Sequence, residues 1–92
     1  MHHNIVLLAA ILATFPLSAL ADEASMQACG KSLSPAARMI YEASAASLPP
    51  SSALRDVVAA QTRKLVMAGR IERAAARPAA EAAGNCLKMA QQ

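Results

Sequence analysis

Aromatic and imidazole side chains are nearly missing from this chain. Its 92 residues include no tryptophan, one phenylalanine and one tyrosine, and its only two histidines are His2 and His3. A surface that stacks nucleic-acid bases needs aromatic rings, so we expect no nucleic acid among the partners. If the N-terminal segment is removed, as argued below, no histidine remains. Triads, metal sites and pH switches that depend on imidazole are then excluded.

Motifs for catalysis and for cofactors are missing as well. The sequence has no Gly-rich phosphate-binding loop, no nucleotide fingerprint and no nucleophile elbow. We interpret the acids as solvated charges, and we expect a non-enzymatic protein with no catalytic residue, no cofactor and no metal. The six acids are scattered at spacings that force no shared pocket: Asp22, Glu23, Glu42, Asp56, Glu72 and Glu81.

An apolar run near the N-terminus is typical of an export signal. Residues 5–13 are almost continuously apolar, and Pro16 follows the run. Ala19 and Ala21 then place small side chains where a signal peptidase reads them. The sequence predicts a signal peptide over residues 1–21, cleaved after Ala21, and a periplasmic or secreted protein. The start of the chain carries no Lys or Arg, so an uncleaved N-terminal anchor stays open as the alternative.

The remaining segment, residues 22–92 starting at Asp22, has the length of one small domain. It is alanine-rich, with 19 alanines among its 71 residues, and alanine favours helix while burying little area. Apolar residues recur at helical spacing, and no alternating β pattern is present. The sequence therefore predicts an all-α fold: a small three-helix bundle with a short extra N-terminal helix.

Start and stop signals place the first two helices. The short one lies within residues 22–33, and we expect Gly30 to end it. The second runs from about Pro35 to Leu48, with Ser34 as its N-cap. Its expected inward stripe puts the lone tyrosine in the core: Ala37, Ile40, Tyr41, Ser44 and Leu48.

The third helix is predicted over about residues 53–68. Ser51 and Ser52 are its candidate caps, and Gly69 suits the left-handed position after its end, with Ile71 folding back on the last turn. Its expected inward stripe is Leu54, Val57, Val58, Gln61, Leu65 and Ala68.

The last helix lies within residues 72–90. Either one helix from Glu72 bends at Pro78, or a shorter helix starts near Arg77, and we favour the single bent helix. Its expected inward stripe is Ala79, Ala82, Ala83, Cys86, Leu87 and Ala90.

The two cysteines, Cys29 and Cys86, are expected to form an intramolecular disulfide outside the cytosol. The bond would close a loop of about 58 residues and stabilise the domain by roughly 4 kcal/mol at most. Free thiols, an intermolecular bond and a redox-active pair are the alternatives. The spacing lacks the Cys-x-x-Cys pattern typical of redox pairs, and two sulfurs without histidine cannot complete a zinc site.

A basic stretch covers residues 63–77, where Glu72 is the only acid. It is a possible interaction surface for an acidic partner or for anionic lipid headgroups, or simply the solvent-facing side of two helices. Its five cations are Arg63, Lys64, Arg70, Arg73 and Arg77.

Four strings resemble a group of short exported proteobacterial proteins with two cysteines and no assigned activity. They are ACG (28–30), LSPAARMIYE (33–42), VMAGRI (66–71) and AGNCL (83–87). This resemblance implies a Gram-negative periplasmic setting and no mechanism. The chain is also similar in size, helix content and cysteine number to small acid-stress periplasmic chaperones, but the residues around its cysteines differ from theirs.

These observations favour an exported accessory protein that acts by binding another protein or by self-association. The large alanine-rich faces suggest apolar surface that a partner completes. The alternative is an acid-activated holdase, because protonation of six acids would raise the net charge from +3 towards +9 and loosen the helices. An anionic membrane surface is a weaker candidate partner.

Overall fold

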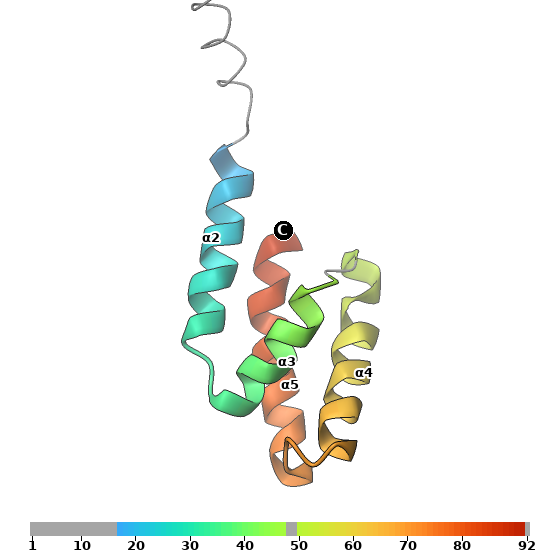
Figure 1. The fold of residues 1–92 in the computed structure, drawn as a ribbon. Helices are drawn as coiled ribbons and strands as arrows, with labels where there is room; N and C mark the ends of the chain where they lie inside the picture. The colour runs from blue at the N-terminus through green and yellow to red at the C-terminus, as the bar shows by residue number, and fades with distance from the viewer. Residues whose placement is uncertain (1–16, 48–49, 92) are drawn as a thin grey trace, which may run out of the picture.

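The computed structural model describes residues 17–47 and 50–91, and this part of the chain is helical and contains no strand (Figure 1). The predicted all-α fold is confirmed. Four α-helices and two short 3₁₀ turns follow one another: α2 (Leu17–Lys31), α3 (Pro35–Ala45), η1 (Ser51–Ala53), α4 (Leu54–Met67), α5 (Arg73–Lys88) and η2 (Met89–Gln91).

Helices α3, α4 and α5 pack against one another as a three-helix bundle, and α2 lies along α5 and η2 (Figure 1). Helix α5 contacts all three of the others and is the centre of the molecule. The bundle buries Ile40 and Leu87 completely, while Ala37 and Ala83 are buried with almost no exposed surface. Because alanine has a short side chain, the backbones of packed helices can approach closely at these positions.

Helix α3 begins as the sequence predicts. The Ser34 side chain accepts a hydrogen bond from the Ala37 backbone N–H at 3.3 Å, and Pro35 occupies the first turn. The predicted stripe of Ala37, Ile40, Tyr41 and Ser44 is buried. The helix ends at Ala45 instead of Leu48, because the chain tightens there into a turn with an N–H···O bond from Ser47 to Ser44. Leu48 itself lies outside the described residues.

The start of α4 corrects the sequence-based expectation. Ser51 and Ser52 do not cap the helix; they belong to η1, and the Ala53 N–H bonds to the Pro50 carbonyl at 2.9 Å. A 3₁₀ turn satisfies the backbone here, so the helix starts at Leu54, directly after this turn and without a side-chain cap.

The end of α4 is as predicted. Gly69 has a φ of 74°, and its N–H bonds to the Val66 carbonyl at 3.0 Å. The Arg70 N–H bonds to the Leu65 carbonyl at 2.9 Å, which completes a Schellman motif. Ile71 then turns back into the core, where it is buried.

The inward face of α4 is only partly as predicted. Leu54 and Val58 are buried, but Ala68 is exposed. Thr62, which the sequence pattern does not indicate, is buried. Its hydroxyl donates to the Val58 carbonyl at 2.7 Å, so the helix itself satisfies this polar group.

Helix α5 is one helix that runs through Pro78, as favoured from the sequence over a shorter helix starting near Arg77. Pro78 lies inside it on the exposed side, one residue before the buried Ala79. Proline has no N–H to donate to the Ala74 carbonyl one turn earlier, and an exposed position leaves that carbonyl open to water. The four buried positions all belong to the predicted stripe: Ala79, Ala83, Cys86 and Leu87.

Helix α2 is longer than predicted at its start and is not ended by Gly30. It begins at Leu17 and continues through Gly30 to Lys31, so it crosses the predicted cleavage point. The carbonyls of its last turn are satisfied from outside the helix: the Ser32 side chain donates to Cys29, and the Arg38 guanidinium donates to Lys31.

Gly30 is needed for a close contact between helices. A Cβ placed on Gly30 would lie 2.5 Å from Cε1 and 2.6 Å from Cζ of Tyr41. The Tyr41 ring therefore packs directly on the α2 backbone. Gly84 in α5 has no such neighbour within 4 Å.

The two helical glycines give a matched prediction. Gly84→Ala should stabilise the protein by about 0.5–1 kcal/mol, because alanine restricts the unfolded chain. Gly30→Ala should destabilise it by about 1 kcal/mol or more, because the new methyl group displaces a buried ring. Urea unfolding of both variants measures the difference, and equal stabilisation by both would contradict the close contact.

Candidate functional site

The predicted disulfide is confirmed. Cys29 in α2 and Cys86 in α5 are bonded, with their Cα atoms 5.4 Å apart and a sequence separation of 57. Cys86 is 1% exposed and belongs to the hydrophobic core. The bond accounts for both cysteines of the chain. Its physical effect is to attach α2 covalently to the central helix of the bundle.

Tyr41 supports the same attachment from α3. Its hydroxyl donates a hydrogen bond to the Met26 carbonyl of α2 at 3.3 Å, and its ring covers Gly30. Burial raises the pKa of Tyr41 above its ordinary value, and the nearby Glu42 carboxylate raises this pKa further. Tyr41, the only aromatic residue in the described part of the chain, is therefore a core residue that joins two helices, as its stripe position predicts.

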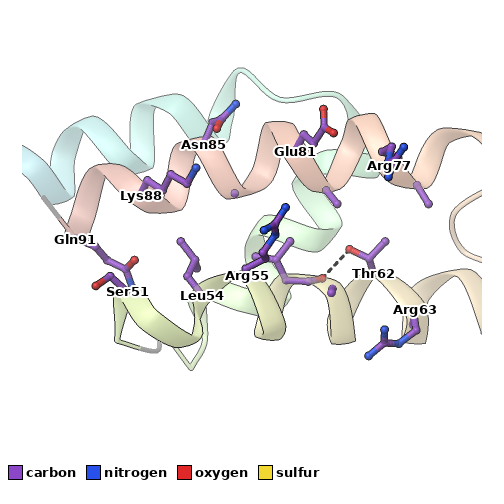
Figure 2. Close-up of a pocket in the computed structure, with 15 residues that line it drawn as sticks. Ser51, Leu54, Arg55, Thr62, Arg63, Arg77, Glu81, Asn85, Lys88 and Gln91 are labelled. Carbon is purple, nitrogen blue, oxygen red and sulfur yellow. Dashed lines mark hydrogen bonds between the residues drawn. The ribbon is translucent and has the colours of Figure 1, made fainter.

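An open groove of about 1130 Å³ lies between α4 and α5 (Figure 2). Small and apolar side chains from both helices form its floor: Leu54, Val58, Ala59, Thr62, Ala76, Ala80 and Gly84.

The rim of this groove is positively charged. Arg55 and Arg63 come from α4, and Arg77 and Lys88 come from α5. Glu81 is the only acid among the lining residues. All five of these side chains are exposed, so the groove joins an apolar floor to a solvated basic edge.

The structure divides the predicted basic surface into two parts. Arg63 and Arg77 line the groove from facing helices, whereas Lys64, Arg70 and Arg73 are exposed but do not line it. The division follows from helical geometry, because neighbouring residues such as 63 and 64 point about 100° apart. That the surface binds a partner stays a prediction.

Two groove cations lie outside the stretch that the sequence analysis singled out. Arg55 is two turns before Arg63 on α4, and Lys88 is three turns after Arg77 on α5. The available signal was the spacing of Arg77, Glu81 and Lys88, which places all three on one helix face.

The end of the α4–α5 hairpin carries a different surface. Met67 is 87% exposed, and the exposed Lys64 and Arg70 are three residues before and after it. Among the described residues, no helix is long and apolar enough to cross a membrane. In the same part of the chain, no group of three or more His, Cys, Asp or Glu side chains could hold a metal ion.

Loss of the disulfide should strongly reduce stability. We expect Cys29→Ala/Cys86→Ala to lower the free energy of unfolding by roughly 2–4 kcal/mol. Thermal unfolding by circular dichroism measures this, and a reductant should lower the wild-type Tm towards that of the variant. The variant, which has no disulfide to reduce, is the control for the reductant. An unchanged Tm in the variant would show that α2 packs without the bond.

Tyr41 should make the protein less stable at alkaline pH. Its folded-state pKa is raised above 10.0, so its contribution is complete below pH 10 and is lost as the pH rises through the folded-state pKa. Tyr41→Phe should cost about 1 kcal/mol near neutral pH through the lost hydrogen bond to Met26. Above about pH 10, the free energy of unfolding of the Tyr41→Phe variant should fall less steeply than that of the wild-type protein. Urea unfolding of both proteins from neutral to alkaline pH measures this difference. If the free energy of unfolding falls equally with pH in the two proteins, the prediction is wrong.

Comparison with known proteins leaves the site to be interpreted from its own residues. No protein-family model, curated protein or solved structure matches the chain. The disulfide and the groove between α4 and α5 are therefore the two observations from which a function can be argued.

Proposed function

We propose that this protein is a non-enzymatic, exported accessory protein that binds a polypeptide partner on the face formed by α4 and α5. The observation that carries the proposal is the groove of about 1130 Å³ with an apolar floor and a basic rim. An apolar groove edged by charge is typical of surfaces that bind other chains. The Cys29–Cys86 bond supports export, because such bonds persist in oxidising compartments.

The chemistry of the groove favours binding over catalysis. Glu81 is the only carboxylate among its lining residues, so the groove offers no second carboxylate for paired acid–base work. The Thr62 hydroxyl already donates to the Val58 carbonyl of its own helix. The guanidinium and ammonium groups at the rim of the groove can bind anionic groups of a partner.

Export places the partner outside the cytosol. The proposed cleavage after Ala21 leaves a chain that starts at Asp22 and keeps the rest of α2, including Met26 and Cys29. Met26, Cys29 and Gly30, which contact Tyr41 or bond to Cys86, are therefore retained. The intact mass of protein recovered from the periplasm should match residues 22–92 less two hydrogen atoms.

Site-specific photocrosslinking tests the proposed partner. A photoreactive amino acid at Ala80 lies on the groove floor, while one at Ala74 lies on the exposed surface of the same helix, outside the groove. In living cells that export the protein, the Ala80 variant should form a discrete crosslinked band that the Ala74 variant lacks. Mass spectrometry of that band identifies a different protein or a second copy of this chain. Equal labelling at both positions, or none at Ala80, would count against the proposal.

A further inference from the structure

We infer that the occupant of the α4–α5 groove is an amphipathic helix with acidic residues along both edges of its apolar face. This inference rests on the proposed function and specifies the partner's chemistry. The groove then accepts one further helix, which another protein supplies, beside α4 and α5. Two independent properties of the groove, its shape and its charge, lead to this conclusion.

The shape of the groove fits a helix. On α5 the lining residues run from Ala76 to Lys88, a distance of roughly 18 Å, or slightly more than three helical turns. Ala59, Ala80 and Gly84 contribute little volume to the floor, so space remains for larger side chains from the occupant. A helix lying between α4 and α5 would insert Leu- or Ile-sized side chains at i, i+3, i+4 and i+7.

The charge of the rim selects acidic flanks. Arg55 and Arg63 line the α4 edge, while Arg77 and Lys88 line the α5 edge together with Glu81. The groove therefore has four cations and one acid, with positive charge on both sides of its floor. An occupant with Glu or Asp beside its apolar stripe would meet cations on both edges, and a basic occupant would be repelled.

The chain itself is a poor source of this occupant. A two-fold contact between copies would bring the same basic rims together, since such an interface uses the same patch on both subunits. Residues 1–16 contain no acid, so they do not complement the rim. A membrane surface is also a poor match, because the apolar residues of the groove lie between α4 and α5 and are bordered by exposed charged side chains.

Two synthetic peptides test the inference on the disulfide-bonded protein recovered from the periplasm. Both are 16-residue amphipathic helices with the same Leu and Ile positions, one flanked by Glu and the other by Lys. Fluorescence anisotropy should show that the Glu-flanked peptide binds about tenfold or more tightly, and that added salt weakens this binding. Circular dichroism should show that the peptide becomes helical in the complex.

A pair of charge-reversal variants separates the groove from net charge. Arg63→Glu/Arg77→Glu changes two rim residues, while Lys64→Glu/Arg73→Glu changes two exposed residues on the same helices that do not line the groove. Both variants have the same net charge. The rim variant should lose about tenfold or more in affinity for the Glu-flanked peptide, and the control variant should change by less than about threefold. Unchanged circular dichroism and Tm confirm that both variants fold.

Three results would overturn the inference: equal affinity for the two peptides, equal loss of affinity in the two variants, or a bound peptide that is not helical. Phosphatidylglycerol vesicles form a further arm, in which we expect no binding at physiological salt. If the protein binds these vesicles and both variants lose this binding equally, the basic residues act as a general anion-binding surface and the groove has no special role. If the peptides fail while Ala80 still crosslinks a partner, the proposed function stands and only the acidic-helix chemistry is wrong.

Discussion

The bond between Cys29 and Cys86 is the interaction on which the rest of the structure depends, because it joins the first described helix to the central one. Among the described side chains of α2, Met26 is the only large apolar one that is buried, and the Tyr41 ring of α3 packs on Gly30. The covalent bond adds stability by limiting the unfolded chain. Because α5 carries Cys86, the bond also fixes α2 against the helix that forms one wall of the groove.

Alanine explains both the tight interior and the open exterior. At Ala37 and Ala83 the short side chain lets helices approach closely, and both residues are fully covered. On the outer face of α4 and α5 the same residue type, at Ala59 and Ala80, is too short to fill the space between the helices. The hydrophobic stabilisation of this bundle is correspondingly small, since each alanine removes little apolar area from water. The high alanine content thus explains both the small hydrophobic stabilisation of the bundle and the unfilled groove between α4 and α5.

The fold was largely predictable because its signals are local. Ser34 and Gly69 act through their own backbone neighbours, so the sequence indicates the start of α3 and the end of α4. Gly30 was misinterpreted because its role depends on Tyr41, eleven residues further on and in another helix. Thr62 was missed for a related reason. Its polarity suggests exposure, but a hydrogen bond within its own helix makes burial acceptable.

The candidate site was less predictable, because it depends on how two helices are rotated about their axes. The sequence shows five cations between residues 63 and 77, but it does not show that only Arg63 and Arg77 of these five line the groove between α4 and α5. The spacing of Arg77 and Lys88 places both on one face of α5, but only the packing of α4 against α5 brings Arg55 to the same groove. A count of charges therefore describes solubility and general attraction to anions. Selection of one partner would require a further constraint, namely that charges lie at defined positions beside the groove between two helices, and this arrangement can be read only from the structure.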